Sequence, residues 1–212
     1  MKIGILALQG SIREHSNIIK KLEANPVKVK FPEDMEDIDA LIIPGGESTT
    51  IGALMKKYRL DKAIKEKHKQ GMPIYGSCAG AILLAKEILD NRQIKLDLMD
   101  ISIKRNEYGR QINSFEADLS IKDIGDFKGI FIRAPVIKSF FNGAEILAEH
   151  RNCPVMVKQD NILLTTFHPE LTNDTRVHEY FLEMVKEYKE VKDMQRGIEK
   201  EKGQEMGLKR FV

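Results

Sequence analysis

The sequence has no tryptophan, only 2 cysteines and no apolar run long enough to cross a membrane. Two cysteines, Cys78 and Cys153, are too few for the disulfide framework of a small secreted protein. The first apolar run, Ile3 to Leu8, is short and is typical of a strand rather than of a signal peptide. We therefore expect a soluble cytoplasmic protein.

An excess of either charge is also missing, because 34 Lys and Arg stand against 32 Asp and Glu. So small a net charge produces no strong field toward nucleic acid or anionic lipid. We expect neither as a partner. The length of 212 residues is enough for one domain with a full core.

Apolar runs and helical patterns alternate along the first half of the chain. Ile3 to Leu8 is unbroken, as in a strand covered on both faces. The Ser11-Ile12-Arg13-Glu14 segment has the spacing of a capping box and predicts a helix from Ser11 to about Glu23. Val27–Phe31 and Asp39–Ile43 predict the next strands. This rhythm indicates an α/β fold, a three-layer sandwich with a mostly parallel central sheet flanked by helices.

Cys78 lies in Gly76-Ser77-Cys78-Ala79-Gly80, between a predicted strand and an apolar run that predicts a helix. Gly-x-Cys-x-Gly in this context is the cysteine form of a nucleophile elbow, in which a sharp turn holds the central side chain at the end of the sheet. A helix N-terminus beside a thiol favours the thiolate. A buried cysteine in a glycine-flanked turn fits this motif equally well.

Two further motifs follow predicted strands. Pro44 to Thr50 (Pro-Gly-Gly-Glu-Ser-Thr-Thr) has glycines that let backbone approach a ligand, although by itself it resembles an ordinary turn. His168-Pro169-Glu170 follows the predicted strand Ile162–Phe167, and Glu170 is placed to orient the imidazole. A cysteine, a distant histidine and a carboxylate have the logic of a catalytic triad, although the tripeptide alone is compatible with an inert loop.

The remaining histidines and cysteine carry no clear chemistry. His15, His68, His150 and His178 lack metal-ligand spacing and are expected to be structural or exposed. Cys153 is expected to be inert, in a turn beside Pro154. Further strands are predicted in the second half, and a helix over Asp174 to about Lys189 precedes a charged segment. The strands are Ile101–Ile103, Phe115–Ile121, Gly129–Ile132, Glu145–Glu149, Val155–Gln159 and Ile162–Phe167.

Taken together, the motifs resemble those of class I (triad) glutamine amidotransferases, and more closely the glutaminase subunits of pyridoxal 5′-phosphate synthase. The resemblance covers the chain to about Lys189. Ser77 replaces a threonine that is common in the family, and the charged C-terminal stretch is longer than usual. The matching segments are Leu8–Gly10, Arg13–His15, Pro44–Thr50, Cys78–Gly80, Arg105-Asn106, Gly109–Gln111, Ser114–Ala117, Phe131–Pro135 and Phe167–Thr172.

The resemblance implies a flavodoxin-like architecture and hydrolysis of L-glutamine to L-glutamate and ammonia. Cys78 would be the nucleophile, His168 the general base and acid, and Glu170 its orienting carboxylate. Backbone N–H groups of Gly46 and Ala79 would form the oxyanion hole. The substrate contacts implied are Gly46, Glu47, Ser48, Arg105, Ile132 and Arg133.

By the same resemblance, the chain delivers ammonia to a (β/α)₈-barrel synthase subunit in a hetero-oligomer and binds no metal or organic cofactor. Gln9-Gly10 and the Gly45–Glu47 loop are the candidates for coupling activity to docking. Residues 1–189 would form the glutaminase domain and 190–212 a charged extension, helical or partly disordered. Two alternatives remain: a γ-glutamyl hydrolase on a similar fold, and a non-catalytic regulatory subunit.

Overall fold

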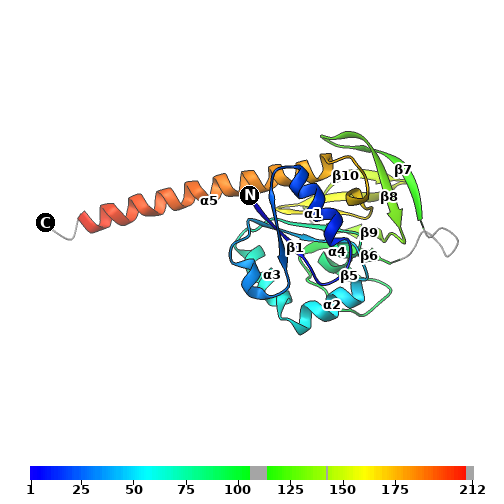
Figure 1. The fold of residues 1–212 in the computed structure, drawn as a ribbon, viewed down its shortest axis with the longest axis horizontal. Helices are drawn as coiled ribbons and strands as arrows, with labels where there is room; N and C mark the ends of the chain where they lie inside the picture. The colour runs from blue at the N-terminus through cyan, green and yellow to red at the C-terminus, as the bar shows by residue number, and fades with distance from the viewer. Residues whose placement is uncertain (106–113, 142, 209–212) are drawn as a thin grey trace.

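A seven-stranded sheet forms the centre of the molecule (Figure 1). The computed structural model describes residues 1–105, 114–141 and 143–208, with residues 195–208 described by their backbone alone. The strand order is β10-β11-β12-β4-β3-β1-β2, parallel from β12 to β2 and antiparallel at β10 and β11. The strands are β1 (Lys2–Leu6), β2 (Asn25–Val29), β3 (Ala40–Ile43), β4 (Ile74–Ser77), β10 (Glu145–His150), β11 (Cys153–Gln159) and β12 (Ile162–Thr165).

Helices cover both faces of this sheet, which confirms the predicted three-layer α/β fold. On one face Ile3 and Ile5 of β1 pack with Ile19 of α1 and Phe181 of α5. On the other, Leu6 belongs to the cluster that includes residues of α2, α3 and α4. Alternate residues of β1 thus enter opposite layers, so the strand must be apolar throughout. The helices are α1 (Ile12–Lys21), α2 (Ser48–Lys57), α3 (Leu60–Lys69), α4 (Ala79–Leu84) and α5 (Arg176–Leu208), with short 3₁₀ turns η1 (Pro32–Met35) and η2 (Pro169–Leu171).

Two smaller sheets lie beside the central one. The first has the order β5-β6-β9, and the second is the antiparallel β7–β8 hairpin. Strands β5 and β9 are absent from the sequence-based prediction, because each is short and β5 follows α4 without a break. Their bounds are β5 (Ala85–Ile88), β6 (Met99–Lys104), β7 (Ser114–Ile121), β8 (Gly125–Ile132) and β9 (Val136–Phe140).

The prediction that Cys153 lies in a turn beside Pro154 is wrong. Cys153 is the first residue of β11 and is paired with His150, while the turn itself is made by Arg151 and Asn152 at positive φ values of 52° and 59°. The tight hairpin predicted at Asp160-Asn161 is confirmed, with Asp160 at a φ of 51°.

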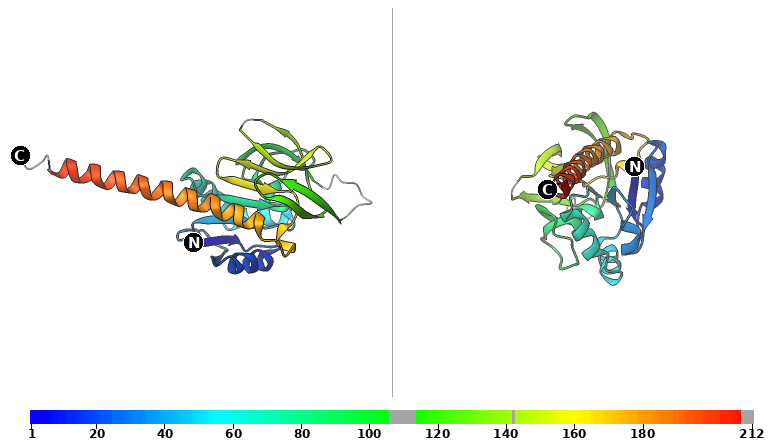
Figure 2. Two further views of the ribbon diagram at one scale, coloured as in Figure 1. Left: turned by 90° about the horizontal axis from the view of Figure 1, so that it is seen from above. Right: turned by 90° about the vertical axis from the view of Figure 1, so that its left-hand side faces the viewer.

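The C-terminal helix is much longer than the apolar pattern indicates. Its backbone passes Lys189 without interruption, and Figures 1 and 2 show it projecting away from the body of the molecule. Val191 and Met194, where the helix leaves the body, are 54% and 67% exposed. Among the described residues, no helix is both long enough and apolar enough to cross a membrane.

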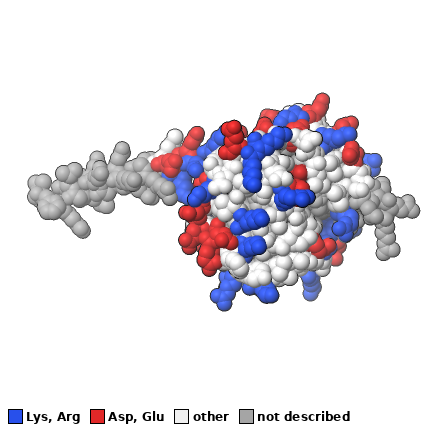
Figure 3. Space-filling model, viewed as in Figure 1, with Lys and Arg blue, Asp and Glu red and all other residues white. Residues whose placement is uncertain are grey.

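Charged groups of both signs occur on the face of the molecule shown in Figure 3. Lys and Arg lie among Asp and Glu there, which agrees with a formal net charge of only +2. The fold therefore presents no face of a single charge in this view.

Candidate active site

Cys78 lies in a strained turn between β4 and α4, as the elbow motif predicts. Its backbone adopts φ 47° and ψ −96°, a conformation that costs energy in any residue with a Cβ. The flanking glycines are sterically required. A Cβ on Gly76 would lie 2.8 Å from the carbonyl carbon of Gly80, and one on Gly80 would overlap the carbonyl oxygen of Ile43.

Strand pairing brings His168 to the same edge of the sheet. β12 runs parallel to β4, with Thr165 opposite Ser77, so the chain leaves both strands side by side. The Cys78 N–H donates to the Thr165 carbonyl at 2.8 Å, and the His168 N–H donates to the Ile130 carbonyl of β8 at 2.8 Å. These backbone bonds place two side chains together that are far apart in sequence.

The imidazole of His168 lies between a thiol and a carboxylate. Its Nδ1 is 2.8 Å from Oε1 of Glu170. Burial alone would lower the pKa of His168, but hydrogen bonds with Cys78 and Glu170 outweigh burial and raise the pKa to about 10. Such a group is protonated at neutral pH and is therefore able to stabilise a neighbouring thiolate.

Glu170 lies behind His168, in η2, with a side chain that is fully buried. Burial would raise the pKa of this carboxyl, but interactions with His15 and His168 outweigh it and hold the pKa well below the usual value. An ionised carboxylate on Nδ1 keeps the proton there and leaves Nε2 of the ring for the thiol.

Ser11 has a different role from the predicted one. Its side chain makes no capping bond with α1. Instead its Oγ donates to Glu170 Oε1 at 2.7 Å. The capping-box prediction was therefore wrong, and the serine belongs to the site. His15 is likewise more than a structural histidine, since its Nε2 is 3.5 Å from the same carboxylate oxygen.

The glycine loop after β3 packs tightly against the turn after β1. Gly10 has a φ of 109°, and a Cβ on it would overlap the carbonyl oxygen of Gly45. The Ser11 N–H donates to that oxygen at 3.0 Å, and Oε1 of Gln9 accepts from the Glu47 N–H at 2.7 Å. The two segments singled out for coupling thus form one hydrogen-bonded unit.

Most of the predicted site residues line a single cavity of about 190 Å³. Of the predicted residues, only Glu170, behind His168, and Ala79, at the start of α4, are not part of its wall. Gln9 and Ile82 complete the lining. The predicted residues in the wall are Gly46, Glu47, Ser48, Cys78, Arg105, Ile132, Arg133 and His168.

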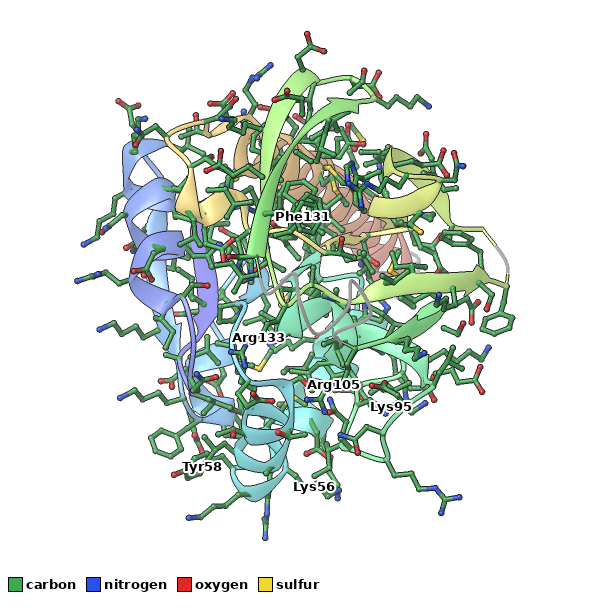
Figure 4. All side chains as sticks on the ribbon, turned by 90° about the vertical axis from the view of Figure 1, so that its right-hand side faces the viewer. Lys56, Tyr58, Lys95, Arg105, Phe131 and Arg133 are labelled. Atoms are coloured by element: carbon green, nitrogen blue, oxygen red, sulfur yellow. The ribbon has the colours of Figure 1, made fainter. Side chains whose placement is uncertain are left out.

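Polar groups at this cavity come from separate parts of the chain. In Figure 4, Arg105 and Arg133 lie near each other between the β7–β8 hairpin and α2. Arg133 has a φ of 43°, and the carbonyl of the preceding Ile132 accepts from the Cys78 thiol at 3.9 Å. A strained non-glycine residue at this position accompanies an inward-facing carbonyl.

Gln93 is a site residue that the sequence analysis missed. Its Oε1 accepts from Arg105 Nη1 at 3.1 Å and from Ser48 Oγ at 3.2 Å, while Arg105 Nη2 contacts Glu47 Oε1 at 3.4 Å. Gln93 therefore connects Arg105 and Ser48, two predicted substrate-binding residues, without itself lining the cavity. No motif marks it, since it lies in an irregular segment. The predicted family segments at Asn106 and Gly109–Gln111 lie outside the described residues.

Within the part of the chain that the structure describes, no group of three or more His, Cys, Asp or Glu side chains is arranged to hold a metal ion. The chemistry available from the described residues is that of a cysteine next to an imidazole and a carboxylate. A thiol, an imidazole and a carboxylate in this order, at the carboxyl edge of a parallel sheet, are the groups that one class of cysteine-dependent acyl-transfer enzymes uses.

Comparison with known proteins agrees with this class. Residues 5–187 match the model of the SNO glutamine amidotransferase family, and the chain belongs to that family. It is 46% identical over 187 residues to the pyridoxal 5′-phosphate synthase subunit PdxT of Thermosipho africanus, covering 88% of this chain and 100% of the relative. For the PdxT of Thermotoga neapolitana the identity is 50% over 188 residues, with the same coverage.

A solved structure described as a glutamine amidotransferase is also similar. It is 45% identical, covers 86% of this chain and 98% of its own, and superposes with a TM-score of 0.84. The structure of PurLQS from Thermotoga maritima, at 15% identity and a TM-score of 0.62, shares the fold over 86% of this chain and 97% of its own. These likenesses confirm the predicted family and the amidotransferase architecture.

Proposed function

We propose that this chain hydrolyses L-glutamine to L-glutamate and ammonia, with Cys78, His168 and Glu170 as its catalytic triad, and supplies the ammonia to a synthase subunit that makes pyridoxal 5′-phosphate. The observation that carries the proposal is the continuous contact from the thiol to the imidazole to the buried carboxylate, at the wall of a cavity. The glutamine amidotransferase family supports the substrate, and the names of the relatives support the pathway.

The reaction begins when the Cys78 thiolate attacks the side-chain amide carbon of glutamine. The N–H groups of Gly46 and Ala79 stabilise the oxyanion, a contribution of about 3–4 kcal/mol per donor. The His168 imidazolium then protonates the departing nitrogen as the C–N bond breaks, and ammonia leaves. Water, deprotonated by His168, attacks the glutamyl thioester, and the C–S bond breaks to release glutamate and restore the thiolate.

Substrate specificity comes from the polar walls of the cavity. Glutamine carries an ammonium and a carboxylate, which need acceptors and donors respectively. Glu47 and the carbonyl of Ile132 supply acceptors, and Arg105 and Arg133 supply donors, with Gly46 and Ser48 completing the wall. Membership of the glutamine amidotransferase family favours glutaminase over γ-glutamyl hydrolase activity.

The partner is a (β/α)₈-barrel synthase subunit in a hetero-oligomer, and we place their coupling at the Gln9–Glu47 contact. The Gln9 amide oxygen ties the turn after β1 to the loop that carries Gly46. Movement of that turn by a docked partner is therefore transmitted directly to the oxyanion donor. We also propose a cytoplasmic location, where Cys78 and Cys153 remain free thiols.

The test is glutamate release from L-glutamine, for the chain alone and with the synthase subunit. Wild type in the complex should be active and Cys78→Ala inactive, while Cys153→Ala, which changes the other free thiol, should match wild type. Equal rates with and without the partner would refute the coupling. Release only from γ-glutamyl peptides would replace glutaminase with γ-glutamyl hydrolase, and full biological function of Cys78→Ala would establish a non-catalytic role.

A further inference from the structure

A buried polar cluster lies beneath the triad and takes no part in the chemistry described above. It consists of Ser11, His15, Ser77 and His178, gathered around the Glu170 carboxylate. His15 and His178 have no exposed surface. Burial of two imidazoles is costly unless their nitrogens find partners, so their retention beside the triad calls for a physical reason.

All of the contacts described for the Glu170 carboxylate are made through one oxygen. Oε1 faces His168 Nδ1 at 2.8 Å, Ser11 Oγ at 2.7 Å, Ser77 Oγ at 3.4 Å and His15 Nε2 at 3.5 Å. Oε2 is buried and has no hydrogen-bond partner among the described residues. Ser11, Ser77 and His15 therefore all contact the same oxygen that contacts His168.

The geometry around His15 determines which of its nitrogens carries a proton toward Glu170. His15 Nδ1 is 2.9 Å from His178 Nε2, and His15 Nε2 is 3.2 Å from Ser77 Oγ. Burial is the largest cause that lowers the pKa of His178 to about 3, so His178 is neutral. His178 Nδ1 has no partner among the described residues, and a buried nitrogen without a partner is less costly as an acceptor than as an N–H.

It follows that His178 carries its proton on Nε2 and donates it to His15 Nδ1. His15 then carries its proton on Nε2, directed at Ser77 and Glu170. If the protons were arranged the other way, a lone pair of His15 would face the carboxylate. The two histidines thus form a chain of donors that ends at the triad carboxylate.

We propose that His15 is a positioning residue of the triad, which, backed by His178, donates toward Glu170 and holds the carboxylate against His168. Ser77 extends the same cluster to the oxyanion loop, since its Oγ accepts from the Gly45 N–H at 2.9 Å. This inference rests on the proposed function, because it assigns a role relative to the proposed triad. His15 does not line the substrate cavity and is expected to affect turnover rather than substrate binding.

Three substitutions of His15 separate this role from simple packing. Leu removes both nitrogens, Asn carries an amide at the position of Nδ1, and Gln carries one at the position of Nε2. Because His15 Nε2 is hydrogen-bonded to Ser77 Oγ and lies 3.5 Å from the buried Glu170 Oε1, its loss in His15→Leu and His15→Asn should lower kcat by roughly 10- to 100-fold with KM little changed. His15→Gln should recover most of kcat. His68→Gln, on α3 and remote from the triad, is the matched control and should equal wild type.

The pH profile supplies a readout that packing alone would not move. The titratable groups facing Glu170 are His15 from α1, His168 from the loop after β12, Tyr75 from β4 and His178 from α5. Loss of the donor from His15 makes the carboxylate easier to protonate. The acid limb of kcat/KM should therefore move to higher pH in His15→Leu and His15→Asn, and should stay near the wild-type position in His15→Gln.

The experiment measures glutaminase kinetics of the complex from pH 5 to 9, with melting temperatures, for these variants, wild type and Cys78→Ala. The positioning role is supported if kcat falls in His15→Leu and His15→Asn and recovers in His15→Gln. The acid limb of kcat/KM should also move in the first two variants. The role is overturned if kcat falls equally in all three variants or in none of them. It is also overturned if the fall in kcat follows the melting temperature while the acid limb of kcat/KM stays in place. An inactive wild-type complex would instead refute the proposed function, and Cys78 alkylation by iodoacetamide across the same pH range would then test the positioning role without turnover.

Discussion

Replacing Gly45 with alanine should inactivate the enzyme through a single methyl group. Gly45 is not in the positive-φ region, so alanine is compatible with its backbone. The new Cβ, however, would lie 2.8 Å from Nδ1 of His168 and closer still to Cε1 of the same ring. Ordinary contacts of a Cβ begin at about 3.4 Å, so the His168 ring must move, whereas the Glu170 carboxylate oxygen, 3.4 Å from the new atom, is at a normal distance.

The size of the effect follows from how far the imidazole must move. Restoring a normal contact requires the ring to retreat by roughly 0.6–1 Å, and a misplacement of this size in a catalytic group costs on the order of 10²-fold in rate. His168 cannot move without lengthening its 2.8 Å bond with Glu170. The free energy of unfolding should fall by only about 1–3 kcal/mol, the usual cost of overpacking.

Glutaminase kinetics of the complex and urea unfolding of the chain test this together. We expect kcat to fall by about two orders of magnitude with KM nearly unchanged, because the new methyl group meets His168 rather than the substrate. Gly4→Ala is the matched control. Its new Cβ would meet Ile38 Cδ1 at 2.5 Å, a similar overlap remote from the site, so it should lose stability and keep kcat. A Gly45→Ala enzyme within twofold of wild-type kcat would show that His168 has more freedom than the packing allows.

Two other predictions concern substrate binding and pH. Arg105→Ala should raise KM for glutamine by roughly 10- to 100-fold with kcat less affected, since it removes a charged donor from the cavity wall; an unchanged KM in steady-state assays would place the substrate carboxylate on Arg133. Because the pKa of His178 falls from 6.5 to about 3 on folding, the unfolded chain binds a proton that the folded one does not between these pH values. The free energy of unfolding should therefore fall as pH drops below 6.5, by up to about 1.4 kcal/mol per pH unit from this group. Urea unfolding of wild type and His178→Gln tests it, and an acid slope that is equally steep in the variant would refute it. His168 acts oppositely: its folded pKa of about 10 adds stability that is complete below pH 6.5 and lost as pH rises toward 10.

Much of the site could be predicted because its residues lie in short, recognisable motifs. The elbow around Cys78 needs glycines at fixed offsets, and the strand that precedes His168 is a clear apolar run. Parallel strands that end in polar motifs place those motifs at one edge of a sheet, whatever lies between them in sequence. The cavity that contains Cys78, His168 and Arg105 is the consequence.

The missed residues share a different property, since their roles arise only from contacts distant in sequence. Ser11 fits a capping box, and nothing local indicates that its hydroxyl instead meets Glu170, 159 positions away. Gln93 lies in no motif, and the family segment Arg13–His15 contains nothing that indicates a contact of His15 with Glu170. Strands β5 and β9 were missed because short strands beside other apolar segments lack a distinctive period.

The sequence by itself determined the α/β layering and the strand–turn–helix placement of Cys78, because these depend on periodicity and on glycines near one another in the chain. The tertiary structure alone decided how the triad is supported. A carboxylate buried with one oxygen facing every donor, and a pair of histidines behind it, exist only when α1, β4, η2 and α5 pack against one another. Hydrogen bonds of this kind are set by distance in space, and one sequence read along its length contains no record of that distance.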